Sequence, residues 1–152
     1  MGNGGHCNTA AHMINDLAKH TVTSDDKQAV VAQRFRFRTL CLNDSASFVT
    51  GIANDMGFDQ IFSEQVANWA EPGDVVLGIS GSGNSKNILK AFEEARKRGM
   101  ATVALLGYDG GEILRRGLVD FPIVVHSDYI PRIQEVQASA YHVIREQRLG
   151  QR

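Results

Sequence analysis

A short loop of serines and glycines, residues 80–85, carries the side chains of this sequence that are best suited to hold a ligand. It runs Ser-Gly-Ser-Gly-Asn-Ser and separates an apolar stretch from an amphipathic one. Glycine lets the backbone turn tightly and approach a ligand, and N–H groups at the start of a helix attract anions. The hydroxyls of Ser80, Ser82 and Ser85 add hydrogen-bond donors. The loop therefore predicts a phosphate site, and the alternative is a plain strand-to-helix turn with a polar cap.

Two further features bear on what this loop holds. It lacks the lysine of a nucleoside-triphosphate-binding loop, which argues against a nucleotide triphosphatase. A second glycine cluster, residues 2–5 (Gly-Asn-Gly-Gly), also leads directly into a helical pattern. Two such loops in one small protein fit a substrate that is held from both ends, whereas the alternative for residues 2–5 is a disordered tail.

The elements that must position these loops alternate between strands and helices in the second half of the chain. Residues 74–79 (Asp-Val-Val-Leu-Gly-Ile) are continuously apolar after Asp74, as expected of a strand that is covered on both faces. An apolar stripe over residues 86–98 predicts a helix that ends at Gly99. Further strands are predicted at 101–106 and 121–125, and further helices at 112–117 and 131–148. This alternation predicts an α/β fold with a parallel sheet, which binds ligands beyond the carboxyl ends of its strands.

The first half of the chain is less regular. Residues 6–20 are rich in alanine and predict a helix, and residues 21–37 are polar and predict a loop or a short exposed element. Residues 39–42 (Thr-Leu-Cys-Leu) predict a short buried strand. Two more helices are predicted, at 46–54 and 60–70.

Size and composition exclude several classes of function. With 152 residues, 43% of them apolar and 22% charged, the chain fits one ordinary globular domain. A formal net charge of −1 gives no electrostatic basis for binding nucleic acid or an anionic membrane. We find no apolar stretch of the roughly 20 residues that span a bilayer, and no signal peptide. Cys7 and Cys41 lack the spacing of a disulfide framework or a metal site, so we expect a reducing, cytoplasmic setting.

Several motifs run in a familiar order through nearly the whole chain. They are residues 2–5 with His12 and Asp16 after them, 53–58 (Ala-Asn-Asp-Met-Gly-Phe), 72–74 (Pro-Gly-Asp), 78–85, 109–111 (Asp-Gly-Gly) and 131–136 (Pro-Arg-Ile-Gln-Glu-Val). Together they resemble the sugar isomerase (SIS) domain superfamily, and within it the phosphoheptose isomerases. The resemblance implies one SIS domain over residues 1–152, with a three-layer parallel-sheet fold of the flavodoxin-like or Rossmann-like kind. The helix and first strand that usually precede the glycine loop are missing from this sequence.

The same resemblance implies an activity. Members of the family interconvert sedoheptulose 7-phosphate and a D-glycero-heptose 7-phosphate, a step toward nucleotide-activated heptose for surface polysaccharides such as lipopolysaccharide or capsule. They assemble as homotetramers. The helix predicted at 131–148 agrees with assembly, because one side of it can pack on the domain while another meets a partner chain. Its predicted apolar stripe consists of Ile133, Val136, Ala140, Val143 and Ile144.

Roles for individual residues also follow from the resemblance. The catalytic acid/base pair would be Asp16 and His142, and a zinc ion would bind to His12, Asp16, Gln134 and His142. The substrate would contact Asn3, Gly4, Gly5, Asn43, Asp44, Ser80, Gly81, Ser82, Ser85 and Gln134. His12 and Asp16 are four residues apart, so they share one face of a helix. Gln134 and His142 are separated by roughly 12 Å along their helix, which suggests that neighbouring subunits combine to form the site.

The chemistry implied is an aldose–ketose isomerisation through an enediol, which needs a base, an acid and firm positioning. Asp16 would be the base and His142 the acid; alternatively, zinc could polarise the oxygens of the substrate instead, since an ion on both residues competes with their use as proton carriers. The chain departs from the family in two of these residues, because Asp16 stands where glutamate is usual and Gly81 where threonine is usual. His6, His20 and His126 have no independent support for a role.

Two alternatives remain at this stage. Some SIS-domain proteins are non-catalytic sugar-phosphate sensors or protein-binding adaptors, in which the acid/base pair is expected to be lost. Because Asp16 and His142 are both present, the sequence favours an enzyme. The other alternative is an isomerase that acts on a different ketose phosphate.

Overall fold

A parallel sheet of three strands lies at the centre of the computed structural model, which describes residues 1–19, 28 and 37–149. The strands are β1 (Val75–Ser80), β2 (Ala101–Gly107) and β3 (Phe121–Val125), in the order β1-β2-β3. Val75 lies opposite Ala101 at one end of the β1–β2 ladder, and Ser80 lies opposite Leu106 at the other. The parallel sheet predicted from the alternation of elements is therefore confirmed.

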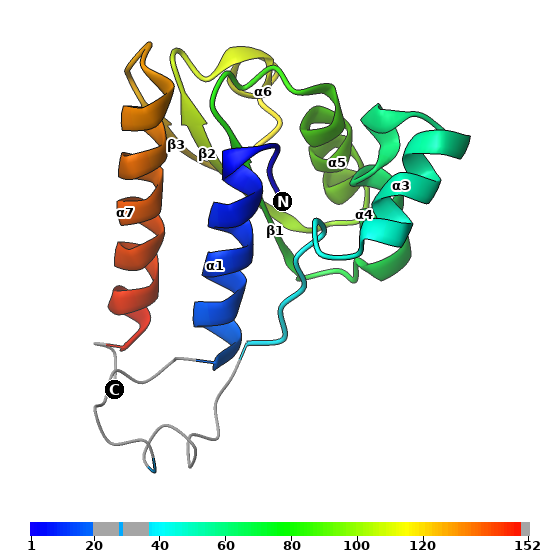
Figure 1. Cartoon of the computed structure of the whole chain (residues 1–152), viewed down its shortest axis with the longest axis horizontal. Coiled ribbons are helices and arrows are strands. Elements are labelled where there is room, and N and C mark those ends of the chain that lie inside the picture. Colours follow the sequence, from blue (N-terminus) through cyan, green and yellow to red (C-terminus); the bar gives the residue numbers. More distant parts are fainter. Residues whose placement is uncertain (20–27, 29–36, 150–152) are drawn as a thin grey trace.

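Helices cover both faces of this sheet and give a three-layer arrangement (Figure 1). They are α1 (Gly5–Lys19), α3 (Ala46–Asp55), the short 3-10 helix η1 (Phe58–Gln60), α4 (Ser63–Trp69), α5 (Lys86–Lys97), α6 (Gly111–Arg115) and α7 (Ile130–Leu149). Helices α1 and α7 lie side by side on one face, and α5 packs on the other with α3 and α4 beyond it. Among the described residues, no helix is long and apolar enough to cross a bilayer.

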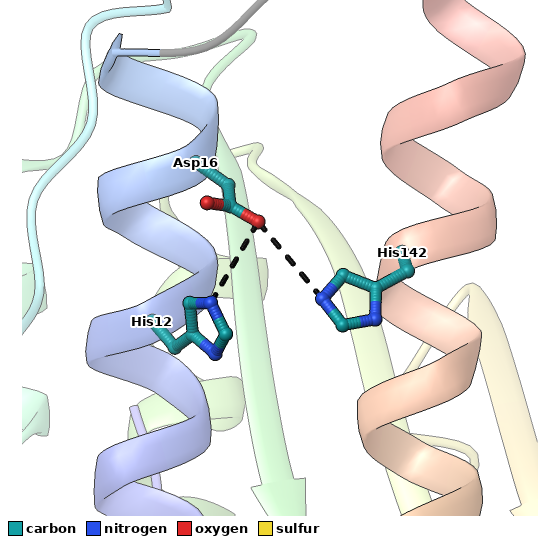
Figure 2. A group of neighbouring side chains, drawn as sticks. All are labelled: His12, Asp16 and His142. Atoms are coloured by element: carbon teal, nitrogen blue, oxygen red, sulfur yellow. Dashed lines mark ion pairs between the residues drawn. The ribbon is translucent and has the colours of Figure 1, made fainter. Parts of the chain in front are cut away.

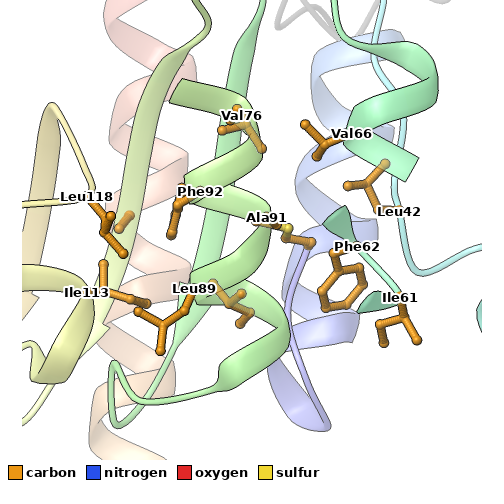
Figure 3. Packing of buried hydrophobic residues seen from close by; sticks show 14 of the residues in the cluster. Leu42, Ile61, Phe62, Val66, Val76, Leu89, Ala91, Phe92, Ile113 and Leu118 are labelled. Atoms are coloured by element: carbon orange, nitrogen blue, oxygen red, sulfur yellow. The ribbon is translucent and has the colours of Figure 1, made fainter. Parts of the chain in front are cut away.

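Alternation of side chains along the strands divides the apolar residues between the two faces. Leu77, Ile79 and Leu105 join the cluster under α1 and α7. Val76 and Leu106 instead join a larger cluster with α5, part of which Figure 3 shows. Because side chains of a strand point alternately to opposite faces, one continuous apolar run builds both cores at once.

Helix α5 packs closely on β1 because glycine stands at position 78. A Cβ on Gly78 would lie 2.6 Å from Cζ of Phe92. The predicted stripe of this helix is confirmed, since Ile88, Leu89, Phe92 and Ala95 are all buried. The helix ends at Lys97, and Gly99 follows with a left-handed φ of 71°. This close packing holds α5 against the sheet, together with the loop of residues 80–85 before it, which we call the serine loop.

The prediction of a strand at residues 39–42 is wrong. The structure describes all four residues, none of them lies in a strand, and Leu40 is 54% exposed. The edge of β1 is paired instead with the first residues of the chain. The Met1 nitrogen donates to the carbonyl of Leu77, and the Ile79 N–H donates to the carbonyl of Met1. An apolar segment beside a sheet thus forms no strand when another segment already holds the edge.

The polar segment 21–37, predicted as a loop or a short exposed element, lies almost wholly outside the described residues. In α7 the predicted apolar stripe is only partly correct, because Val136 and Val143 are exposed. The side chains that face inward are at a spacing of four residues: Ile133, Gln137 and Tyr141.

At the far edge of the sheet, β3 pairs only with β2 among the described strands, and its Phe121 is 62% exposed.

Candidate active site

The serine loop leaves hydroxyl donors available for a ligand. Ser80 ends β1, is 2% exposed, and accepts a hydrogen bond of 3.1 Å at Oγ from the Gly83 N–H. Ser82 is exposed and accepts one of 3.2 Å from the Asn84 N–H. A hydroxyl that accepts a backbone hydrogen bond still has its own proton to donate. The loop therefore fixes the oxygen of Ser82 while its O–H remains able to bind an anion.

The same loop is fastened to the start of α6. Oδ1 of Asn84 accepts a hydrogen bond of 2.9 Å from the Glu112 N–H, and the Gly83 carbonyl accepts one of 3.0 Å from the Ile113 N–H. Gly83 has a φ of 67°, and a Cβ there would lie 2.0 Å from the carbonyl oxygen of Gly110. Only glycine fits at this position. This explains the glycine in a loop that was predicted to turn tightly.

The second glycine loop lies against the first turn of α5. Nδ2 of Asn3 donates to Oδ1 of Asn87, and Nδ2 of Asn87 donates to Oδ1 of Asn3, both at 2.9 Å. Asn87 is buried and comes two residues after Ser85. This amide pair joins the two loops predicted to hold the substrate, at the carboxyl end of β1.

Other residues predicted to contact the substrate lie near the start of α1. A Cβ on Gly5 would lie 2.6 Å from Nε2 of Gln134, so the Gln134 side chain rests on the glycine loop. The amide of Asn43 is engaged by the backbone of Gly2, from whose N–H it accepts and to whose carbonyl it donates. Asp44 is exposed in the turn that follows. Gln134 therefore lies against the glycine loop of residues 2–5. Asn43 instead bonds to the backbone of this loop at Gly2.

His6 occupies the space beside Gly81. A Cβ on Gly81 would lie 3.3 Å from Cε1 of His6 and 2.9 Å from Cδ1 of Ile130, so a side chain at position 81 would require both neighbours to shift. His6 is 8% exposed, and its Nε2 has no hydrogen-bond partner in the described part of the chain. Burial lowers the pKa of His6, and contacts with the Asn3 backbone and the Gln137 side chain offset this only in part.

The predicted acid, base and metal ligands meet on the neighbouring faces of α1 and α7 (Figure 2). Oδ2 of Asp16 lies 4.0 Å from Nε2 of His12 and 4.0 Å from Nε2 of His142. Ligand atoms of the three side chains all lie within 4.8 Å of one another. Asp16 is 7% exposed, whereas the two imidazoles are partly open to solvent. The sequence therefore identified three residues that the fold places together from positions up to 130 apart.

Gln134, the fourth predicted metal ligand, lies elsewhere on α7. It contacts Gly5, which precedes His12 by seven residues, or roughly 10 Å along α1. Its place in the ligand set of the ion stays a prediction.

Tyr141 is a component of the cluster that the sequence analysis missed. It is 1% exposed, and its hydroxyl lies 2.8 Å from Nδ1 of His12. Asn87 was missed in the same way. Both are polar residues at positions of a buried helical stripe, because Asn87 shares its stripe with Ala91 and Ala95, and Tyr141 with Ile133. A polar residue on a buried stripe is the signal that could have identified them.

Comparison with known proteins gives consistent similarities. The SIS domain family model matches residues 5–107. The chain is 39% identical over 149 residues to a phosphoheptose isomerase of Trichlorobacter lovleyi, covering 95% of this chain and 68% of that protein. It is 42% identical over 144 residues to one of Geobacter sp. strain M21, covering 95% and 69%.

Solved structures give the same result. The structure of a phosphoheptose isomerase from Neisseria gonorrhoeae matches with a TM-score of 0.84 and 32% identity, over 97% of this chain and 73% of that one. A phosphoheptose isomerase from Francisella tularensis also matches with a TM-score of 0.84, at 30% identity, over 99% and 74%. Both similarities extend over almost all of this chain.

Proposed function

Because the chain belongs to the SIS-domain family of phosphoheptose isomerases, we propose that it interconverts sedoheptulose 7-phosphate and a D-glycero-heptose 7-phosphate. The observation that supports the proposal is that the fold carries two groups of residues suited to different chemistry. The serine loop at the carboxyl end of β1 suits a phosphate, and the cluster on α1 and α7 suits proton transfer. An aldose–ketose isomerase that acts on a phosphorylated sugar needs both.

The serine loop would hold the phosphate. Ser82 and Ser85 are accessible, the amino-terminal end of α5 follows directly, and neutral donors of this kind bind a phosphate dianion well. Gly4, Gly5 and Gln134 would contact the sugar, since they lie between this loop and the middle of α1.

Asp16 and His142 would move the protons. In the ketose-to-aldose direction, Asp16 as base removes a proton from C1, which gives an enediol, and returns it to C2. His142 as acid supplies a proton to the carbonyl oxygen at C2, and then takes up the proton that the hydroxyl at C1 loses as the aldehyde forms. Asp16 is buried and fixed between two imidazoles, so it is held in one position rather than free in solvent.

The cluster also fits a zinc ion. Two imidazoles and one carboxylate are the donor set of many catalytic zinc sites, which keep a fourth position open. Ligand atoms around a tetrahedral zinc lie about 3.4 Å apart, and Asp16 lies only slightly farther from His12 and His142. We propose that His12, Asp16 and His142 hold the ion, with Gln134 as a ligand if a neighbouring subunit supplies it. When bound, zinc would polarise the oxygens at C1 and C2 in place of a proton from His142.

We propose in addition that the protein works as a homotetramer in the cytoplasm. Val136 and Val143 present an exposed apolar strip on the outer side of α7, which an assembly would cover. Cys7 and Cys41 are free thiols, as is usual in a reducing compartment.

The test is an assay of the purified chain with sedoheptulose 7-phosphate in D2O, followed by NMR. Formation of the aldose with deuterium at C2 is expected, because the proton carried by Asp16 exchanges with solvent. Fructose 6-phosphate and ribulose 5-phosphate, offered separately, test for an isomerase of another ketose phosphate. Binding of sedoheptulose 7-phosphate without turnover, with and without added zinc, would identify a sensor and contradict the proposal.

A further inference from the structure

Tyr141 and His12 form a contact that no role considered so far explains. Tyr141 lies in the core between α7 and α1, where it packs with Met13, Ile79 and Leu105. Its hydroxyl reaches Nδ1 of His12 at 2.8 Å, and the two rings meet edge to face with centroids 5.5 Å apart. The phenol is 1% exposed, so its hydroxyl is held in place by the packing of the ring.

The two nitrogens of the His12 ring have different neighbours. Nδ1 faces Tyr141, and Nε2 faces Asp16 at 4.0 Å. In a neutral imidazole one nitrogen carries the proton and the other has the lone pair, and the partner of one nitrogen decides the state of the other. Through the His12 ring, Tyr141 therefore acts on the nitrogen that faces Asp16.

A hydroxyl suits this position better than any other group, because it can both donate and accept. Without a cation, His12 should direct an Nε2–H at the Asp16 carboxylate and accept a hydrogen bond from Tyr141 at Nδ1. With a cation on Nε2, the proton should lie on Nδ1, and the Tyr141 hydroxyl should accept a hydrogen bond from this Nδ1–H. A carboxylate or carbonyl in the place of Tyr141 could serve only the second state.

We propose that Tyr141 is a positioning residue that holds the His12 ring and supplies the hydrogen bond that Nδ1 needs in each state. The proposal rests on the proposed function only in taking His12, Asp16 and His142 as the site. Groups that orient metal-binding histidines in this way typically contribute about 10- to 100-fold to metal affinity.

The experiment compares wild type with Tyr141→Phe, which keeps the buried ring and removes only the hydroxyl. Nitrogen-15 NMR of the histidine side chains reports which ring nitrogen carries the proton, and His12→Ala assigns the His12 signals. His126 is an internal reference, because its Nδ1 lies 3.1 Å from the Tyr108 carbonyl and must carry a proton there. Tyr129→Phe, which removes the hydroxyl of an exposed tyrosine, is the matched control.

We expect the Nδ1 shift of His12 to move in Tyr141→Phe but not in Tyr129→Phe, and calorimetry to show zinc affinity reduced by about 10-fold or more. A folded Tyr141→Phe protein with the His12 spectrum of wild type would overturn the proposal, whether or not zinc binds. If the spectrum changes while wild type fails to isomerise any sugar phosphate, the proposed function fails and the role of Tyr141 stands.

Discussion

Asn3 and Asn87 exchange two hydrogen bonds of 2.9 Å through their side-chain amides, and so join the glycine loop to the first turn of α5. Asn87 also accepts a hydrogen bond at Oδ1 from the Ile88 N–H. One buried amide thus orients both loops that the substrate is proposed to contact. The pair therefore links the two loops directly to each other.

The first prediction concerns this pair. Asn87→Ala should lower the free energy of unfolding by about 1–3 kcal/mol, because it leaves the amide of Asn3 without its buried partner. It should also raise KM more than it lowers kcat, since the acid and base lie on other helices. Urea unfolding and steady-state kinetics measure the two effects. Asn54→Ala, which removes an exposed amide, is the control; equal losses in both variants would argue against a special role for the pair.

The second prediction separates two serines of the same loop. Ser82→Ala should raise KM by roughly 10-fold with little loss of stability, because the exposed hydroxyl is proposed to donate to the phosphate. Ser80→Ala should lower stability by about 1–3 kcal/mol, because it leaves the buried Gly83 N–H without an acceptor. Thermal unfolding and kinetics of both variants distinguish the roles. Unchanged KM in Ser82→Ala would place the phosphate elsewhere.

The third prediction concerns the acid and the base. Asp16→Asn and His142→Gln should each lower kcat by roughly 10²-fold or more, the scale of general acid–base catalysis. Binding of the sugar phosphate should survive, since the serine loop is untouched. Calorimetry with the substrate and single-turnover kinetics provide the measurement. Turnover at the wild-type rate in either variant would remove that residue from the mechanism.

Asp16→Glu is a sharper form of the same test, because it supplies the carboxylate that is usual in the family. Asp16 is 7% exposed between two imidazoles, so an additional methylene must be accommodated in a packed position. We expect kcat to fall, by less than in Asp16→Asn, because the base remains but is displaced. A variant with higher kcat than wild type would show that the shorter carboxylate is a compromise.

The fourth prediction follows from the lowered pKa of His6. Its ordinary value is near 6.5, and burial lowers the pKa in the folded protein. Below about pH 6.5 the unfolded chain therefore binds a proton that the folded chain resists, so stability falls as the pH falls through this value. His6→Gln should lose less stability than wild type between pH 7.5 and pH 5.5 in urea unfolding. Parallel losses in the two proteins would mean that other groups cause the decline.

Elements whose burial leaves a regular pattern along the chain were predicted correctly. The apolar run of β1 was sufficient to predict a strand, and the stripe of Ile88 and Phe92 was sufficient to predict helix α5. Residues 39–42 were mispredicted, since an apolar tetrapeptide does not reveal that Met1 already pairs with β1. Edge pairing depends on segments far apart in sequence.

The candidate site shows the same division. Resemblance identified His12, Asp16 and His142, and the fold places them together. It did not identify Tyr141, and it gave no role to His6. The structure shows what each of them faces: Tyr141 faces Nδ1 of His12, and His6 faces Gly81. Such contacts depend on the crossing of α1, α7 and the sheet, which a linear pattern does not record.

The edge formed by β3 has a consequence for how copies of this protein can assemble. Proline on an edge strand discourages addition of another strand, and β3 carries Pro122 beside the exposed Phe121. Aggregation by continuation of the sheet is therefore hindered at this side, although an apolar side chain is presented there. Self-association should instead favour the helical surface of Val136 and Val143. Contact there needs no backbone hydrogen bonds, and no further copies can add once partner copies cover this surface.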